Sequence, residues 1–161
     1  MSQTHVRPAS DADRPTLEAF MAALQEHERA LHDSRLPGAA MAAEHLAYLL
    51  GEVAEHQGCC LIAERGGTPI GFLIGVVERQ AGRYLAGGYD AMGLITDVYL
   101  VDAARGTDAL DALLAAAEAH FRALGIDRLL LFHLEENAPA ARAYAKRGFA
   151  PYERVLIKRI G

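Results

Sequence analysis

The sequence has few features that would tie it to a membrane or to an oxidising compartment. In 161 residues it holds two cysteines, and these are the adjacent residues Cys59 and Cys60. Adjacent residues of a strand point to opposite faces, and the two cysteines do not have the spacing of zinc ligands. We therefore expect free thiols and no bound metal. Free thiols indicate a cytoplasmic protein. No apolar run approaches the ~18 residues of a membrane span. Residues 1–8 contain no secretory apolar region.

Lysine is also scarce, with two lysines against 14 arginines. The formal net charge is -5, and residues 1–58 carry four arginines against nine Asp and Glu, whereas residues 59–161 are balanced. A nucleic-acid surface needs a basic stripe, which is missing, so we expect no nucleic-acid partner. The simplest interpretation of the acidic third is a solvated helix surface, and the alternative is an electrostatic funnel for a cationic amine.

The sequence is 52% hydrophobic, which is enough to form the core of one domain over residues 1–161. Apolar periodicity and turn residues predict an ordered series of elements: strand 5–7, a helix from Asp11 or Asp13 to about residue 31, helix 39–56, strands 59–63, 70–77 and 94–101, helix 108–124, strand 128–134, helix 137–147 and strand 152–160. The hairpin implies antiparallel pairing, and the later strand–helix–strand unit implies a parallel pair. We therefore predict an α/β fold with a mixed, mostly antiparallel sheet and about four helices.

Residues 137–149 form the most informative segment. Asn137 suits a helix N-cap, Ala140 and Tyr144 share one helix face, and Gly148 suits the left-handed position after the helix, before Phe149. An ordinary capped helix with a buried Tyr would explain each feature alone. Together they resemble the last conserved helix of the GNAT superfamily of N-acetyltransferases. The order of elements, the turn 65–72 and the segment 97–106 are similar to that family over essentially the whole chain.

The resemblance implies acetyl-CoA as acyl donor and a primary amine, on a small molecule or a protein, as acceptor. It places Asn137 and Tyr144 beside the thioester, with Tyr144 as the general acid. The thioester carbonyl would be polarised by the backbone of one strand, formed by Val98, Tyr99, Leu100 and Val101. The pyrophosphate would bind the following loop, formed by Arg105, Gly106, Thr107, Asp108, Ala109 and Leu110.

This loop departs from the family pattern at Asp108 and Leu110, where small residues are expected. Asp108 suits an N-cap and Asp111 lies in the first turn, so two carboxylates are expected to crowd the amides that bind phosphate. Like charges about 4 Å apart repel by about 4 kcal/mol at an effective dielectric of 20, which would make cofactor binding weak. A second hypothesis is therefore a non-catalytic GNAT-like domain that binds a ligand or partner. An accidental resemblance in a generic α/β domain is the third.

Direct attack by an amine also needs a base, since an amine of pKa ~10.4 is less than ~0.1% neutral at pH 7. Asp97, in the strand before the loop, is the first candidate. Glu78, at the end of the neighbouring strand, is the second, and His133 is the third.

Four weaker features leave alternatives open. Glu28 with His32, and Glu52 with His56, have i,i+4 spacing that could bind a metal, although solvated helix pairs are the simpler interpretation. The Gly-rich segment 80–93 could be a lid over the acceptor or a mobile hairpin. Pairing of the last strands of two copies would give a homodimer.

Overall fold

The computed structural model describes residues 3–161 and contains one five-stranded sheet in the order β1-β2-β3-β4-β5. The strands are β1 His5–Pro8, β2 Cys59–Arg65, β3 Thr68–Arg79, β4 Ala91–Leu100 and β5 Leu129–Leu131. The helices are α1 Arg14–Arg29, α2 Gly38–Glu55, α3 Ala109–Ala123 and α4 Ala138–Ala145, with short 3-10 turns η1 Asp11–Asp13 and η2 Asp102–Ala104.

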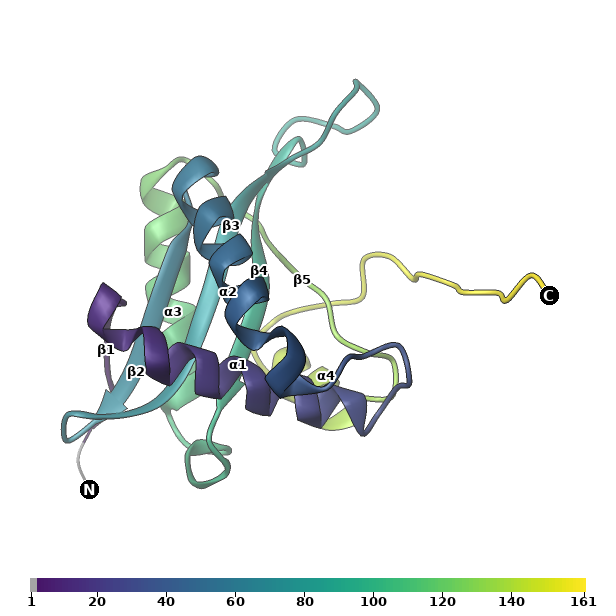
Figure 1. Cartoon of the computed structure of the whole chain (residues 1–161). Helices are drawn as coiled ribbons and strands as arrows, with labels where there is room; N and C mark the ends of the chain where they lie inside the picture. Colours follow the sequence, from purple (N-terminus) through teal and green to yellow (C-terminus); the bar gives the residue numbers. More distant parts are fainter. Residues whose placement is uncertain (1–2) are drawn as a thin grey trace.

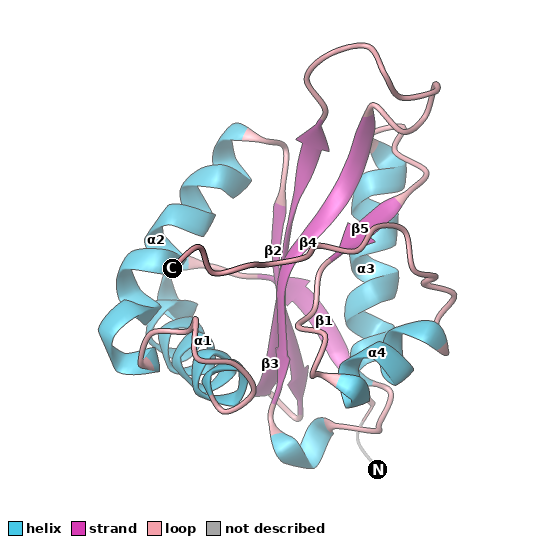
Figure 2. Ribbon diagram, turned by 90° about the vertical axis from the view of Figure 1, so that its right-hand side faces the viewer, coloured by secondary structure: helices cyan, strands magenta, loops and turns pink. Residues whose placement is uncertain are grey.

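The sheet is mixed, as predicted. β1 to β4 pair antiparallel in sequence order, and β4 pairs parallel with β5 after the crossover through α3. Helices α1 and α2 cover one face of the sheet and α3 covers the other, so the molecule has three layers (Figures 1 and 2). No helix in the described residues is long and apolar enough to cross a membrane.

Strand β3 separates two apolar cores because its side chains alternate between the faces. Phe72 and Ile74 are fully buried under α1 and α2, and Leu73 is fully buried under α3. The packing of α3 on the sheet also explains why one residue of β4 is a glycine. A Cβ on Gly93 would lie 2.7 Å from the Phe121 ring, so only glycine lets this helix pack so closely on β4.

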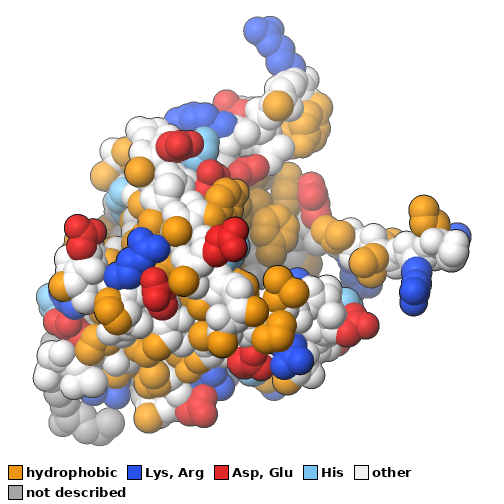
Figure 3. Space-filling view, viewed as in Figure 1, with side chains coloured by type: hydrophobic (Ala, Val, Ile, Leu, Met, Phe, Trp, Pro, Cys, Tyr) orange, Lys and Arg blue, Asp and Glu red, His pale blue; other side chains and the backbone are white. Residues whose placement is uncertain are grey.

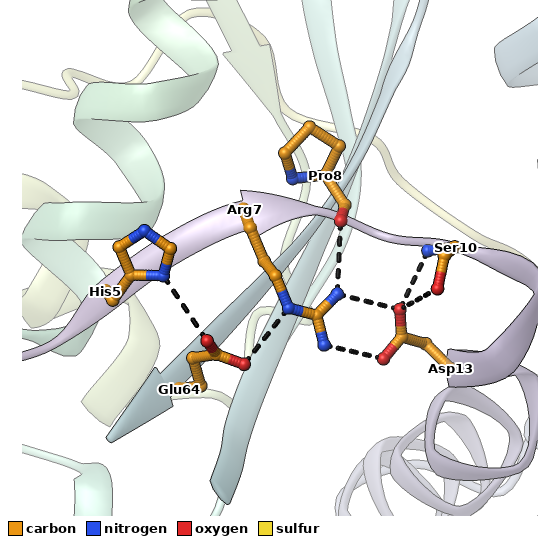
Figure 4. Close-up of polar contacts among 6 residues, drawn as sticks. All are labelled: His5, Arg7, Pro8, Ser10, Asp13 and Glu64. Atoms are coloured by element: carbon orange, nitrogen blue, oxygen red, sulfur yellow. Dashed lines mark hydrogen bonds and ion pairs between the residues drawn. The ribbon is translucent and has the colours of Figure 1, made fainter. Parts of the chain in front are cut away.

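An ionic network fixes β1 to β2 and to the start of α1 (Figure 4). The Arg7 guanidinium donates two 2.8 Å bonds to Asp13 and one of 3.0 Å to Glu64. Asp13 also accepts from the Ser10 backbone N–H and hydroxyl. These donors, Arg7 first, hold the pKa of Asp13 far below its usual range.

The predicted strand at 152–160 is wrong for the single chain. Residues 150–161 have no regular secondary structure and extend away from the body (Figure 1). Val155, Leu156, Ile157 and Ile160 are 83–87% exposed. A strand pairs its N–H and C=O groups with a neighbouring edge, and this segment does not lie along one. We call residues 152–160 the C-terminal arm.

Candidate functional site

An open edge of the sheet lies where β4 and β5 separate. β4 pairs with β5 only at Gly93, Leu94 and Ile95, but pairs with β3 as far as Leu100. The register between β3 and β4 shifts after Ile95, which leaves Thr96 as an extra residue in β4. A bulge of this kind bends a strand and redirects the side chains that follow. Residues 96–100 of β4 therefore have no strand beside them on the β5 side within the described structure.

The backbone direction at this edge follows from two hydrogen bonds. The Gly93 N–H donates to Arg128 O on the β5 side, and after the bulge the Val101 N–H donates to Ile70 O on the β3 side. Because N–H groups alternate along a strand, those of Val98 and Leu100 face the open edge. The two amides lie about 7 Å apart along the strand, so either of them, but not both, can bind and polarise one carbonyl oxygen laid along the edge.

Asp97 directly follows the bulge and lies opposite Ile74, on the face covered by α1 and α2. Its side chain is half-buried, and burial raises the pKa of its carboxyl above the usual range. The Thr96 hydroxyl and His45 oppose that rise in pKa, whereas the Glu28 carboxylate adds to it. A carboxylate with a raised pKa is a stronger base, which suits proton removal from an amine.

Tyr144 lies on α4, whose start is fixed as predicted. The Asn137 side chain accepts from Ala140 N at 3.2 Å, which makes Asn137 the N-cap. Burial raises the pKa of Tyr144 to about 12, and the Glu28 carboxylate contributes to that rise. The Tyr144 ring packs edge-on against Phe149 at 5.8 Å between ring centres. The His133 ring, the third sequence candidate, lies 6.4 Å from that of Tyr144.

Glu28 connects these groups, since its charge acts on both Asp97 and Tyr144. It lies at the end of α1, and its carboxylate accepts from Arg35 Nε at 2.7 Å. The predicted pairing with His32 is wrong, because His32 Nδ1 bonds the Ser34 hydroxyl instead. The sequence patterns pointed to Glu28 only as a possible metal ligand with His32, and they did not point to His45. The acidity of residues 1–58 was the signal that could have pointed to Glu28.

The loop before α3 differs from the expectation in one important respect: Asp108 does not crowd the helix amides. It takes the N-cap position without a side-chain cap bond. Its carboxylate instead accepts from the Thr4 hydroxyl at 2.8 Å and from Arg65 Nη2 at 2.9 Å. Thr4 first, and then Arg65, lower the pKa of Asp108. The carboxylate is thus held on the β1 and β2 side and is paired with a cation.

Asp111 and Leu110, which were also expected to hinder binding of the cofactor, are accommodated too. Asp111 accepts two bonds from Arg147, at 2.7 and 2.9 Å, so its charge is also paired. Leu110 is half-buried against the α3 core. Its side chain therefore packs into the protein.

The other groups at the N-terminal end of α3 favour the binding of an anion. Gly106 has φ of +73°, which lets the loop turn tightly into the helix. The first-turn amides of a helix carry partial positive charge and bind phosphate. Arg105 adds a cation: its Nε donates to Leu100 O, its Nη1 pairs with Asp102 at 2.9 Å, and its side chain is about half exposed. Thr107 donates to Ala104 O, and Ala109 is fully buried. The loop therefore combines a tight glycine turn, a helix N-terminus and an arginine, the features that favour a diphosphate, close to the end of the open β4 edge.

Three features lie elsewhere. Glu78 pairs with Met92, four positions along β3 from Ile74, or about 13 Å from Asp97 along the sheet. The segment between β3 and β4 continues past that end of the hairpin, away from Asp97. Glu52, Glu55 and His56 have ligand atoms within 4.8 Å of one another, but they lie at the end of α2 on the surface. The structure therefore does not bring Glu78 together with Asp97 and Tyr144.

Comparisons with known proteins agree with this geometry. A sequence model of the Acetyltransferase (GNAT) family matches residues 19–149. Over 91 residues the chain is 38% identical to mycothiol acetyltransferase from Thermobispora bispora. The match covers 55% of this chain and 28% of that enzyme, so the chain spans less than a third of this curated relative.

Solved structures share the fold over nearly the whole chain. An aminoglycoside N-acetyltransferase, AAC(6')-Iy, in complex with CoA has a TM-score of 0.76 at 17% identity, covering 99% of this chain and 96% of that one. A GCN5-related N-acetyltransferase from Ralstonia eutropha has the same TM-score at 24% identity, covering 99% of this chain and 100% of that one. At these identities the likeness is one of fold.

Proposed function

Because the chain belongs to the Acetyltransferase (GNAT) family, we propose that it is an N-acetyltransferase that transfers the acetyl group of acetyl-CoA to a primary amine. One observation carries the proposal: the carboxylates of Asp108 and Asp111 are paired with arginines, and Asp108 makes no cap bond to the amides at the start of α3. One of those amides, the Ala109 N–H, donates to the Thr107 hydroxyl at 3.3 Å, a contact that a bound anion would replace. The open β4 edge begins next to that loop. A diphosphate on the loop and an acyl arm along the edge would place the thioester near Asp97.

In this proposal the thioester oxygen accepts from the N–H of Val98 or Leu100. Asp97 removes a proton from the ammonium of the acceptor, directly or through a water, and leaves a neutral amine. The amine nitrogen forms a bond to the acyl carbon as the carbon–sulfur bond breaks. Tyr144 keeps its proton to high pH, because burial raises its pKa to about 12, and it donates a hydrogen bond or that proton to the leaving sulfur. The nitrogen loses its second proton as the amide forms, to the sulfur through water or to the Tyr144 phenolate, and Asp97 releases its proton to solvent. The products are a neutral amide, the CoA thiol and one proton.

We propose a cationic amine as the acceptor. Asp97 supplies the charge that supports this, and Glu28, although paired with Arg35, adds a second carboxylate on the same side of the sheet. An acidic site raises the local concentration of cations and stabilises an ammonium before it is deprotonated. We further propose that the protein acts in the cytoplasm, where thiols such as those of Cys59 and Cys60 stay reduced, and that it is a homodimer.

The hypothesis of a non-catalytic binding domain rested on crowding of the loop by Asp108 and Leu110. The contacts of Asp108 with Thr4 and Arg65 remove the physical basis of that argument. We therefore retain the enzyme as the proposed function.

The test is release of the CoA thiol from acetyl-CoA in the presence of a panel of amines. The panel should pair cationic compounds, such as polyamines, aminoglycosides and lysine peptides, with neutral amines of similar size. We expect thiol release that depends on the amine and acetylated products that are visible by mass spectrometry. Binding of acetyl-CoA with no transfer to any amine of the panel would count against the proposal.

A further inference from the structure

An ion pair between Glu28 and Arg35 joins the end of α1 to the turn that precedes α2. Arg35 Nε donates to Glu28 Oε2 at 2.7 Å, while Arg35 Nη1 donates to the Ser34 hydroxyl at 3.2 Å. The pair therefore uses one oxygen of the carboxylate and one nitrogen of the guanidinium. Arginine binds a carboxylate most strongly through two parallel bonds, so this contact is weaker than such a pair can be. Both side chains are also open to solvent, with 26% of Glu28 and 35% of Arg35 exposed.

Two other contacts hold the turn in place without Arg35. Gln25 Nε2 donates to Leu36 O at 3.0 Å, and the Gly38 N–H donates to Glu26 Oε1 at 2.6 Å. Both contacts run from side chains of α1 to the backbone of the turn and of the first residue of α2. The position of the turn is thus fixed by its backbone, and the ion pair is free for another task.

Glu28 lies beside the groups that are proposed to react. Its charge raises the pKa of both Asp97 and Tyr144, so its carboxylate is close to both. Helix α1 packs on β4 through Phe20, whose ring lies 5.4 Å from that of Tyr99. The turn after α1 lies at the same end of the molecule as α4 (Figures 1 and 2). The protein therefore keeps a cation of its own at the acceptor side of the site.

The surrounding surface does not offer an incoming cation a broad acidic patch. On the face covered by α1 and α2, Figure 3 shows acidic and basic side chains interspersed. Neighbouring carboxylates of α1 carry their own partners, as in the pairs Glu18–Arg14 and Glu26–Arg29. A cationic group of the acceptor must therefore exchange with a cation of the protein, and Glu28 is the carboxylate next to the reacting groups.

An acceptor with two cationic groups can make this exchange while it reacts. Its reacting nitrogen must lie at Asp97, so a different group of the same molecule has to bind Glu28. Once the first ammonium is bound, the second is held near Glu28 at a high effective concentration. The exchange replaces one cation with another and leaves no buried carboxylate unpaired, which keeps its cost low. An acceptor with a single ammonium leaves Arg35 in place and gains nothing from Glu28.

We propose that Arg35 is a specificity-determining residue: it occupies Glu28 in the free protein and is displaced by the second cationic group of a dicationic acceptor. This inference rests on the proposed acetyl transfer and adds which amines are selected. Diamines and other dications are preferred over monoamines of the same length.

The first test compares α,ω-diaminoalkanes of several lengths with the n-alkylamines of equal length as acceptors. The wild type should favour the diamine of the best length by about tenfold in kcat/KM, the usual scale of a hydrogen bond to a charged group. Arg35→Gln leaves Glu28 free, so the preference should rise by about a further tenfold, through a lower KM of the diamine. Arg35→Lys supplies a competing cation again and should return the preference toward the wild-type value.

The carboxylate is tested in the same assay. Glu28→Gln should abolish the preference for diamines. Adding Arg35→Gln to Glu28→Gln should change nothing further, because the two residues act through one contact. Arg14→Gln makes the same substitution at an exposed arginine at the start of α1, where its partner is Glu18, and should keep the wild-type preference. Circular dichroism checks that every variant is folded.

Calorimetric titration of the diamines without acetyl-CoA gives a second readout that needs no turnover. Affinity should rise about tenfold in Arg35→Gln and be lost in Glu28→Gln. Wild-type affinity and wild-type preference in Arg35→Gln would overturn the proposal, as would equal kcat/KM for diamines and monoamines in every variant. If no amine is acetylated, the proposed function fails by its own test, and the titration still decides whether Arg35 competes for Glu28.

Discussion

At the scale of single residues, the site contains two titratable groups with opposite tasks. In the proposed mechanism Asp97 accepts a proton and Tyr144 holds one. Burial raises both pKa values, which strengthens the carboxylate as a base and keeps the phenol protonated. They lie on different elements, β4 and α4, and the proposed mechanism has them act on the two sides of a thioester.

Asp97→Asn should lower kcat by about a hundredfold or more, the usual effect of losing a general base. The variant should also change the pH dependence of the folding stability, in a direction that follows from the raised pKa of Asp97. A folded pKa above the unfolded value means that the native state binds more protons, so wild-type stability falls as pH rises from about 4 through the raised pKa. Melting curves from pH 4 to 8 should therefore favour the variant increasingly toward pH 8. A variant that matches the wild type in kcat would contradict the assignment.

Tyr144→Phe should lower kcat at least tenfold and change the Kd of acetyl-CoA by less than about threefold, because the hydroxyl acts on the leaving sulfur. The ring, which packs on Phe149, is retained, so the melting temperature should change little. Tyr48→Phe, which removes the same hydroxyl from a tyrosine that is 59% exposed on α2, is the matched control and should keep the wild-type kcat. Full turnover by the Phe variant would make Tyr144 a structural residue.

At the scale of elements, local sequence signals predicted most of the fold correctly. The Asn137 cap and the left-handed Gly148, with φ of +87°, are properties of a few adjacent residues. The orientation of Asp108 could not be predicted in this way, since its partners Thr4 and Arg65 lie 104 and 43 residues away. The strand at 152–160 was predicted wrongly for a related reason, because a strand also depends on the edge beside it.

Asp108→Ala tests the corrected view of the loop. The structure predicts that it will not tighten acetyl-CoA binding tenfold, because the carboxylate already faces Arg65 and Thr4. It should lower the melting temperature, since Arg65 has a buried Nε without a partner among residues 3–161 and would lose a further contact. Thermal unfolding and calorimetry measure the two effects. A tenfold gain in affinity would restore the crowding hypothesis.

Asp13→Asn tests the junction of β1 with α1. Loss of the charge-assisted bonds to Arg7 should lower the melting temperature at pH 7 by about 5 °C. The pKa of Asp13 is depressed in the fold, so its contribution is present above the unfolded value near 4 and is lost as pH falls through the folded pKa. The variant and the wild type should therefore converge in acid. Asp11→Asn, at an exposed neighbouring position, should behave as the wild type.

At the scale of the whole molecule, the mixed sheet and its layers of helices position the loop before α3, the open β4 edge and α4 around one region. The sequence predicted this architecture because the order of elements and their turns restrict the possible topologies. It did not predict that Glu28 influences the pKa of Asp97, since α1 and β4 come together only through packing. That residues 1–161 act as one acyltransferase domain stays a prediction.

The central claim is that the loop before α3 binds acetyl-CoA, and calorimetric titration at two salt concentrations tests it most directly. The account predicts saturable binding at one site per chain, weaker at the higher salt concentration because the diphosphate is held by partial charges and Arg105. Gly106→Asp, which adds a carboxylate at a residue with φ of +73°, should abolish the binding. The absence of heat with wild-type protein at millimolar acetyl-CoA, or equal binding by the variant, would contradict the claim.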